Sequence, residues 1–384
     1  MEDRSYYKKI LERSLGIPFT SGNKVTVLKN GNQIFPAMLK AISDSKKRVE
    51  FLTFVYWKGD IAVKFAHALA EKAKEDVEVT VILDSIGAAS IPPELYDLMV
   101  NNGVCVEWFR PVANWKVWKV DNRTHRKVLI CDGEVAFTGG VGIAEEWEGD
   151  ASNENEWRDT HFKIVGPAVF GLQAAFMENW IETGQQLKFD HFIDTDPNPN
   201  HKTDIQVIRT SASVRWSDII MLYLSLILMA RESIYITTAY LNPNSTILNS
   251  LVEAAERGVN IQIMVPGRHT DQKIARIAGD DSFQPLLDAG VDLWYYQKTM
   301  LHSKTITIDG IVSCVGSANF NHRSMLKDDE VNVVILDKKV AGILNEHFEE
   351  DMESSDKISE ARWKQRNMFR RITEKISLLF SQQI

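Results

Sequence analysis

The apolar and polar positions of the chain follow one order of secondary-structure elements twice. Short runs of apolar or alternating residues predict β-strands, and the segments between them carry apolar residues every three or four positions, which predicts amphipathic helices. In the first half we expect strands at 24–28, 49–56, 77–83 and 104–108, and helices at 35–44, 62–74 and 92–102. Strands that alternate with helices favour a mostly parallel sheet with helices on both faces.

The second half repeats this order. Its strands are expected at 204–208, 233–238, 259–265 and 291–295, and its helices at 218–230, 247–257 and 285–289. A repeat this long indicates a duplicated domain and not a solenoid. The polar, proline-bearing stretch 194–200 favours a connection, so we expect one domain at 1–185, a linker at 186–203 and a second domain at 204–384. Residues 1–22 predict a short helix and a loop, and 30–32 a turn.

Four residues that can carry chemistry or shape a turn recur in register. They are His125, Lys127, Asp132 and Gly139, with counterparts 177 positions later at His302, Lys304, Asp309 and Gly316 (302 − 125, 304 − 127, 309 − 132 and 316 − 139). Apolar residues after each lysine predict a strand, and the Asp-Gly dipeptide at its end predicts a two-residue hairpin turn. Residues two apart on a strand share a face, so we expect each histidine beside its lysine.

An imidazole next to an ammonium group suits attack on, or protonation of, a group bonded to a phosphate. A double displacement at phosphorus needs both a nucleophile and an acid, and two copies that face each other across a pseudo-twofold axis would supply both. The Gly-Ser-x-Asn segment 316–319 offers donors to phosphate oxygens. Two fixed ammonium groups make a divalent metal unnecessary, and no cluster has metal-ligand spacing, so no cofactor is expected.

The pattern H-x-K-x4-D followed by G-S-x-N resembles that of the phospholipase D superfamily over nearly the whole chain. The segments 139–142 (Gly-Gly-Val-Gly), 157–161 (Trp-Arg-Asp-Thr-His) and 166–167 (Gly-Pro) look more similar to bacterial cardiolipin synthases. The resemblance implies an α/β fold of two pseudo-twofold-related repeats, each a mostly parallel mixed sheet flanked by helices, with the active site at their interface. It also implies phosphatidyl transfer through a phosphohistidine, of the cardiolipin synthase type. Phospholipase D hydrolysis to phosphatidic acid and a metal-independent nuclease are the alternatives.

The resemblance implies roles for single residues as well. His125 matches the nucleophile and His302 the general acid and base, although the residues alone do not break this symmetry. The family's acid that fixes an imidazole matches Glu330 in the second half and Asp159 in the first. The expected site is catalytic His125, Lys127, His302, Lys304, Asp159 and Glu330, phosphate-binding Asn319, Ser317 and Gly140, and the turn residues Asp132 and Asp309 as structural anchors.

The composition limits which binding partners and which location we expect for the protein. The net charge of −8 argues against a general electrostatic grip on nucleic acid. We expect a phospholipid such as phosphatidylglycerol or phosphatidylethanolamine as partner, with an alcohol or water as acceptor. The N-terminal residues do not form a signal-peptide pattern, and the apolar run 219–230 is shorter than the ~18 residues of a membrane span. We therefore expect a cytoplasmic protein, peripherally attached to the membrane, with Cys131 and Cys314 packed in the core.

Two segments leave alternatives open. The insertion 111–123 mixes tryptophans with basic residues beside the first motif, and predicts either a loop packed on the core or a rim that contacts lipid headgroups. The tail 361–380 has an apolar face flanked by basic residues, and predicts either a packed terminal helix or a helix at an anionic membrane surface. A lipid-binding protein without activity is a third class, which two intact His-Lys pairs disfavour.

Overall fold

The computed structural model describes residues 2–111, 121–187, 198–211, 217–271, 282–359 and 363. The N-terminal half contains α1 (Glu2–Leu15), β1 (Thr20–Lys29), α2 (Asn30–Asp44), β2 (Arg48–Thr53), α3 (Asp60–Lys74), β3 (Glu78–Asp84), α4 (Pro93–Asn101), β4 (Cys105–Phe109), β5 (Val128–Cys131), β6 (Val135–Gly139), a 3-10 turn η2 (Glu145–Trp147), β7 (Thr160–Val165) and α5 (Val169–Glu182).

The C-terminal half follows the same plan. It contains β8 (Thr203–Thr210), α6 (Asp218–Met229), β9 (Ser233–Thr237), β10 (Leu241–Asn242), α7 (Ser245–Glu256), β11 (Asn260–Pro266), α9 (Phe283–Asp288), β12 (Asp292–Tyr296), β13 (Thr305–Ile308), β14 (Val312–Gly316), β15 (Phe320–Asn321), α10 (His322–Leu326), β16 (Glu330–Leu336), α11 (Lys338–Met352) and β17 (Ser355–Lys357).

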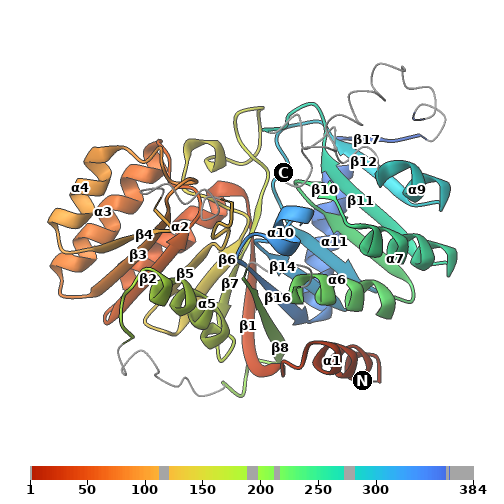
Figure 1. Ribbon diagram of the computed structural model, residues 1–384, viewed down its shortest axis with the longest axis horizontal. Helices are drawn as coiled ribbons and strands as arrows, with labels where there is room; N and C mark the ends of the chain where they lie inside the picture. The colour runs from red at the N-terminus through yellow and green to blue at the C-terminus, as the bar shows by residue number, and fades with distance from the viewer. Residues whose placement is uncertain are drawn as a thin grey trace.

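The two halves lie side by side along one continuous sheet (Figure 1). Within the described residues its strand order is β17-β12-β11-β9-β13-β14-β16-β8-β1-β7-β6-β5-β2-β3-β4, while β10 and β15 form a separate short pair. The predicted α/β class, with a large mixed sheet flanked by helices, is confirmed.

The direction of the strands differs from the prediction. Within the described residues of the large sheet, only the neighbours in β2-β3-β4 and β9-β11-β12 pair in parallel, as does the separate pair β10–β15. The other neighbours in the described sheet are antiparallel. The expectation of mostly parallel sheets was therefore wrong in this respect. The β5–β6 and β13–β14 hairpins place antiparallel strands, which need no helical crossover, between the parallel strands and the centre.

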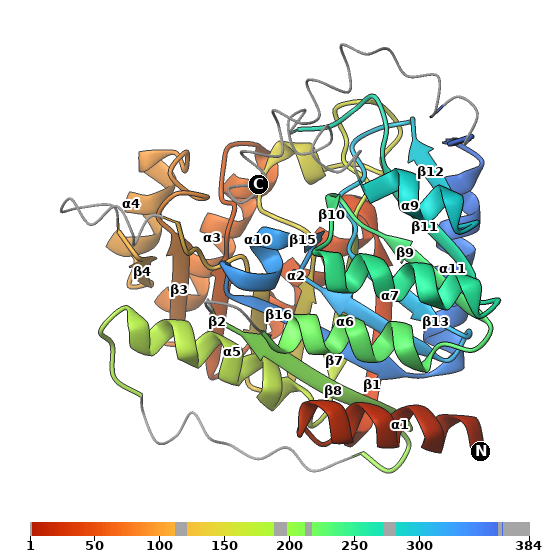
Figure 2. The ribbon, with the colours of Figure 1, turned by 45° about the vertical axis from the view of Figure 1, so that its right-hand side comes forward.

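The halves are joined by the antiparallel pair β1–β8 and by a shared apolar core. Phe162 of β7 belongs to one buried cluster with Ile205, Val315 and Val333 of the C-terminal half. Full burial of each such side chain contributes about 1.5–3 kcal/mol, so the joint is a core and not a loose domain contact. In Figure 2, α5, α6 and α7 lie in front of the sheet and α11 lies behind it.

The first helix, α1, belongs to the N-terminal half by sequence but packs against the C-terminal half. Tyr7 and Leu11 of α1 are buried in the same cluster as Ile220 of α6, and Figure 1 shows α1 below the C-terminal half. The domain boundary at 185 stays a prediction, but the packing of α1 crosses it.

Both motif hairpins have the predicted two-residue turn. The N–H of Ile311 donates to the carbonyl of Ile308 at 3.0 Å, and Asp309 takes the left-handed conformation with φ of 52°. Asp132 in the first hairpin has φ of 56°. Positive φ at both central residues is what an Asp-Gly hairpin turn requires. The expected turn at 30–32 was wrong, because α2 begins there.

The segments with open alternatives lie largely outside the described residues. This applies to 112–120 of the tryptophan-rich insertion, 188–197 of the linker, and the tail 361–380 except Trp363. The Trp363 ring is buried and stacks on Phe283 with ring centres 5.1 Å apart. Within the described part of the chain, every helix is too short or too polar to cross a bilayer.

Candidate active site

Each motif histidine is placed by a backbone bridge to the other half of the chain. The N–H of His125 donates to the carbonyl of Asp329 at 2.9 Å. The N–H of His302 donates to the carbonyl of Arg158 at 2.8 Å. Because an acidic residue follows directly after Asp329 and after Arg158, each bridge carries one histidine to the acid of the opposite half.

The histidine and acid side chains are paired across the two halves. Nδ1 of His125 lies 3.0 Å from Oε1 of Glu330, and Nδ1 of His302 lies 2.9 Å from Oδ2 of Asp159. Sequence reasoning identified both acids but not this crossed pairing, because spacing along the chain gives no information on which half faces which. One centre therefore contains both histidines, and neither half has a complete site alone.

The charges of these pairs follow from their burial. Burial, with a smaller contribution from the nearby ammonium groups, lowers the pKa of His125 to about 4 and that of His302 to about 3, although the paired carboxylates act in the opposite direction. Burial alone would raise the pKa of Asp159 and Glu330, but hydrogen bonds from the imidazoles and the positive lysines outweigh it and keep both pKa values low. Each pair is thus a neutral imidazole whose Nδ1–H donates to a carboxylate, and each Nε2 keeps its lone pair.

Both motif lysines are buried beside their histidines. Nζ of Lys127 donates to the carbonyl of His125 at 2.8 Å, and Nζ of Lys304 donates to the carbonyl of His302 at 2.5 Å. Burial lowers the pKa of Lys127 to about 7 and that of Lys304 to about 8. Each lysine also lowers the pKa of the histidine in the other half, so the two half-sites share one electrostatic environment. An anion between the two ammonium groups would offset their mutual repulsion.

The three expected phosphate-binding residues have different surroundings. The hydroxyl of Ser317 donates to Oε2 of Glu330 and accepts from the N–H of Val331 at 3.0 Å, so it holds the acid and does not face an open position. Asn319 is buried, and its side-chain oxygen has no hydrogen-bond partner among the described residues. Gly140 lies against the carboxylate of Asp159. Of the three, Asn319 has a side-chain oxygen free to accept a hydrogen bond, whereas a phosphate oxygen would have to bind its amide NH₂ group.

The motif aspartates make the contacts of structural anchors. Asp132 accepts the backbone N–H groups of residues 46, 47 and 48 at 2.8, 2.8 and 3.0 Å. Asp309 accepts those of residues 231, 232 and 233 at 2.9, 2.7 and 2.8 Å, and also the hydroxyl of Tyr7 at 2.6 Å. Each aspartate ties its hairpin turn to the start of the neighbouring strand.

Aromatic rings, which the sequence analysis did not assign to the site, surround the two histidines unequally. The His302 ring has Trp147 at 5.2 Å and Trp157 at 5.3 Å, measured between ring centres, whereas His125 has Phe54 at 5.3 Å. Trp147 also donates its indole N–H to Oδ2 of Asp159 at 2.9 Å. The one available signal was the position of Trp147 in a second inserted loop, residues 145–156 before Asp159, and no periodicity distinguishes it.

Two buried arginines, also not predicted, hold the crossed arrangement together. Arg126 donates to the carbonyls of Glu330 at 3.2 Å and Thr210 at 2.9 Å, which links the first motif to the second half. Arg158 forms an ion pair with Asp351 of α11 at 3.0 Å. Removing one member of a buried charge pair leaves the other uncompensated, which is costly.

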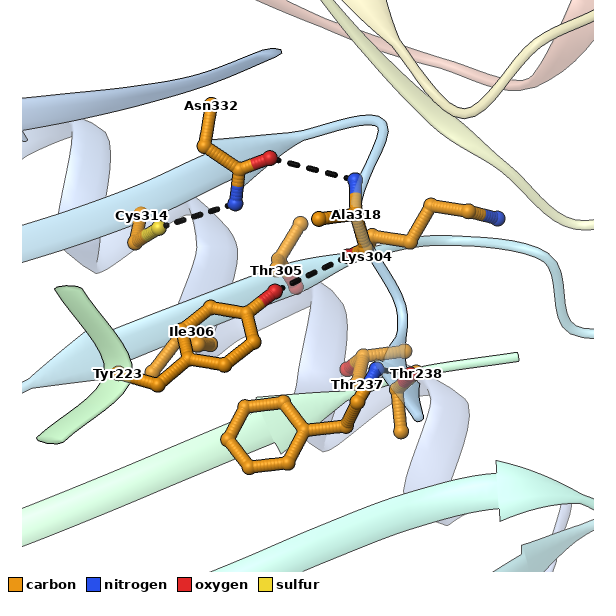
Figure 3. A pocket seen from close by; sticks show the side chains of 10 residues that line it. Tyr223, Thr237, Thr238, Lys304, Thr305, Ile306, Cys314, Ala318 and Asn332 are labelled. Atoms are coloured by element: carbon orange, nitrogen blue, oxygen red, sulfur yellow. Dashed lines mark hydrogen bonds between the residues drawn. The ribbon is translucent and has the colours of Figure 1, made fainter. Parts of the chain in front are cut away.

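A small cavity lies behind Lys304 (Figure 3). Its volume of about 10 Å³ is room for a single water molecule, so it cannot hold a substrate. In Figure 3 the Lys304 side chain extends away from Tyr223 and Asn332, which line this cavity. On the side away from the cavity, Nζ of Lys304 lies 3.2 Å from Nε2 of His302. Among the described residues, no three His, Cys, Asp or Glu side chains are arranged to hold a metal ion.

Two half-sites that join in this way define the phospholipase D class of fold and active site. The family model described as "Cardiolipin synthase, PLD-like domain" matches residues 38–161 and 223–352, and the chain belongs to this family. The resemblance stated from the sequence motifs is confirmed.

Two relatives are similar along nearly the whole chain. Cardiolipin synthase of Staphylococcus aureus is 30% identical over 365 aligned residues, which cover 94% of this chain and 74% of the relative. Cardiolipin synthase 1 of Bacillus cereus is 29% identical over 391 aligned residues, which cover 99% and 77%. The solved structure of a phosphatidylserine synthase of Haemophilus influenzae shares the fold with a TM-score of 0.71 at 14% identity, and covers 98% of this chain and 100% of that one.

Proposed function

We propose that the protein is a phosphatidyltransferase of the cardiolipin synthase type, which moves the phosphatidyl group of a phospholipid to an alcohol through a phosphohistidine. The observation that carries this proposal is the crossed pairing, in which two neutral imidazoles, each oriented by a carboxylate from the opposite half, share a centre with two ammonium groups. Membership of the cardiolipin synthase, PLD-like domain family supports the class of substrate.

In the first step, Nε2 of His125 attacks the phosphorus of the phospholipid and forms a P–N bond. The bond from phosphorus to the headgroup oxygen breaks, and that oxygen takes a proton from Nε2 of His302. In the second step, the acceptor alcohol gives its proton to His302 and attacks phosphorus, and the P–N bond breaks. Lys127, Lys304 and Asn319 would face the non-bridging oxygens, where donors that are already in place stabilise the charge of the transition state.

His302 has to take up a proton from the solvent when the substrate binds, before it can protonate the leaving oxygen. The imidazole is neutral in the unliganded protein, because burial and then Lys304 lower its pKa. An anionic phosphodiester that binds between the ammonium groups offsets their field, while Asp159 stabilises the imidazolium that forms. His302 then acts as an acid only in a site that holds substrate, which protects the free enzyme from idle proton transfer.

The remaining parts of the proposal concern place and partners. Phosphatidylglycerol or phosphatidylethanolamine serves as donor, a second lipid alcohol as acceptor, and the protein binds peripherally to the membrane that contains them. Three free cysteines, two of them buried, fit the reducing cytoplasm. Water as acceptor would give phosphatidic acid, and the same chemistry on nucleic acid would be a nuclease.

The test is product analysis with vesicles of phosphatidylglycerol that carries a labelled glycerol headgroup. We expect cardiolipin and free glycerol in equal amounts, and loss of both in His125→Ala and His302→Ala. His67→Ala, at an exposed position on α3, is the matched control and should keep full turnover. Phosphatidic acid as the main product would replace transfer with hydrolysis. No lipid product, together with cleavage of plasmid DNA in chelator, would replace the proposal with the nuclease alternative.

A further inference from the structure

We propose that Trp147 is a positioning residue of the active site, whose indole N–H holds Asp159, and through it His302, as the Ser317 hydroxyl holds Glu330 and His125. The two halves thus fix equivalent acids with chemically different donors from different places in the repeat. This inference deepens the proposed function and depends on it only for its effect on turnover.

The second half shows the arrangement that the first half lacks. The Ser317 hydroxyl donates to Oε2 of Glu330, the carboxylate that accepts from Nδ1 of His125. The N–H of Val331, directly after the acid, donates back to the Ser317 oxygen at 3.0 Å. Glu330 is therefore held from two sides, by the imidazole and by the serine of the Gly-Ser-x-Asn segment.

In the first half this serine position cannot carry a side chain. Gly140 is the counterpart of Ser317, with the same offset of 177 as the motif (317 − 140). A Cβ atom on Gly140 would lie 2.3 Å from Oδ1 and 2.6 Å from Oδ2 of Asp159, well inside van der Waals contact. Asp159 approaches the backbone of the segment so closely that its donor has to come from elsewhere.

Trp147 supplies that donor from the inserted loop. Its Nε1–H donates to Oδ2 of Asp159 at 2.9 Å, the same oxygen that lies 2.9 Å from Nδ1 of His302. The other oxygen, Oδ1, accepts the N–H of Thr160 at 2.7 Å. Both carboxylate oxygens of Asp159 are therefore occupied by donors that are buried and point in fixed directions.

The loss of a second side chain makes room for the indole. Gly142 is the counterpart of Asn319 (319 − 142 = 177), and a Cβ atom there would lie 3.1 Å from Cζ3 of Trp147 and 2.7 Å from Cβ of Val55. The departure of segment 139–142 from Gly-Ser-x-Asn is thus explained at both positions. One glycine admits the carboxylate, and the other helps to admit the ring that binds it.

The ring is held firmly enough for this role. Trp147 ends η2, is 2% exposed, and packs on Trp157 with ring centres 4.4 Å apart. Its edge also meets the His302 ring at an angle of 81°. An indole N–H only donates, whereas a hydroxyl can both donate and accept, so Trp147 favours the ionised form of Asp159 at every stage. His302 takes up and releases a proton during the proposed cycle, and it needs such a permanently charged partner.

The test removes the N–H and keeps a ring. Trp147→Phe should lower kcat about 10- to 100-fold with little change in KM, because the orienting partner of a reacting group is lost. It should also raise the pKa of His302, read from histidine NMR, since a carboxylate with one donor fewer attracts the imidazolium more strongly. Replacement of Trp147 by 3-benzothienylalanine, which has the shape of tryptophan without the N–H, should give the same shift without disturbing the packing.

Trp57→Phe is the matched control. The indole of Trp57 donates to the carbonyl of Gly87 at 2.7 Å, and its ring lies 6.2 Å from that of Trp147. This variant loses a comparable hydrogen bond without touching Asp159, so the pKa of His302 should stay unchanged. An unchanged pKa of His302 in both Trp147 variants, or an equal shift in Trp57→Phe, overturns the inference. The NMR readout needs no lipid, so it can succeed even if the proposed activity fails.

Discussion

Glutamine in place of Glu330 removes the negative charge beside Nδ1 of His125 and preserves the shape of the side chain. The amide oxygen can still accept from the imidazole. The amide N–H can donate to the Ser317 oxygen, because the serine hydroxyl can turn to the carbonyl of Val331, which lies 3.3 Å away. The tautomer of His125 is therefore kept, and the lost quantity is the charge of the partner.

The size of the effect follows from that loss. A hydrogen bond to a charged group contributes about 1.5–3 kcal/mol, against about 0.5–1.5 for a neutral one. The difference between the two is about 1–1.5 kcal/mol. When it is fully expressed in the transition state, Glu330→Gln slows formation of the phosphohistidine by about 5- to 15-fold, at tenfold for each 1.36 kcal/mol. Had the amide turned its N–H toward Nδ1, the nucleophilic nitrogen would carry the proton and the loss would reach about 10⁴-fold, the size of loss that the wrong histidine tautomer causes in a serine protease triad.

The assay distinguishes the roles of the two histidines by changing the leaving group of the substrate. Rapid-quench measurement of the labelled phosphohistidine is made with phosphatidylglycerol and with a p-nitrophenyl phosphodiester, whose leaving group needs no acid. Glu330→Gln should be slow with both substrates. Asp159→Asn, which acts on His302, should be slow with the lipid and close to wild type with the p-nitrophenyl ester. Glu94→Gln, an exposed change on α4, serves as the control.

The reasoning would be refuted if the two variants exchanged their responses to the p-nitrophenyl ester. If Asp159→Asn were slow with the p-nitrophenyl ester and Glu330→Gln were not, His302 would be the nucleophile. Equal behaviour of both variants with both substrates would mean that the crossed acids do not act on separate steps.

Three further predictions concern the shape, charge and anchoring of the site. Gly140→Ala should lower turnover at least about 100-fold, because its Cβ would displace the acid by a large part of an ångström, whereas Gly342→Ala, with open space around it, should not. Sulfate, whose charge is constant above pH 4, should bind at least about tenfold more weakly at pH 9 than at pH 6 in calorimetry. The pKa values of Lys127 and Lys304 are about 7 and about 8. Below these values both side chains are protonated and attract the anion, and they lose their charge as the pH rises through them. An affinity for sulfate that stays constant between pH 6 and pH 9 would contradict this prediction. Tyr7→Phe should lower the free energy of unfolding by about 1.5 kcal/mol in urea titration, since Asp309 loses a donor, and an unchanged midpoint would show that the bond contributes nothing.

Local features of the site were predictable because they depend on neighbours in sequence. The Asp-Gly turns at 132–133 and 309–310 need positive φ, which these residue types tolerate, and the structure has it. The strands after Lys127 and Lys304 follow from their apolar runs and begin directly after each lysine, at Val128 and Thr305. Spacing along the chain therefore predicted that each lysine lies beside its histidine.

Features that depend on contacts between halves were not predictable. Residues 30–32 were predicted to form a turn. The N–H of Asn30 instead donates to the carbonyl of Asp159, and its side chain donates to the carbonyl of Asp150. The start of α2 is therefore set by contacts with the inserted loop and the residues after it. The same holds for the crossed acids. Glu330 follows His302 in sequence yet binds His125, because β1–β8 pairing brings the ends of the two repeats face to face. Periodicity encodes which side of a strand is buried, not which strand lies opposite.

The difference between the halves has a chemical reason. Twenty positions separate Gly139 from Asp159, but only fourteen separate Gly316 from Glu330 (159 − 139 and 330 − 316), and the additional residues form the loop that carries Trp147. A symmetric pair of half-sites would give both histidines the same surroundings, and neither would be favoured as nucleophile. With an indole donor and two tryptophan rings on one side, and a serine hydroxyl and Phe54 on the other, the two imidazoles differ in burial and in the partners of their acids. The insertion thus breaks the symmetry that the duplication created, and it gives different surroundings to two histidines of which, in the proposed mechanism, one bonds to phosphorus and the other moves the proton.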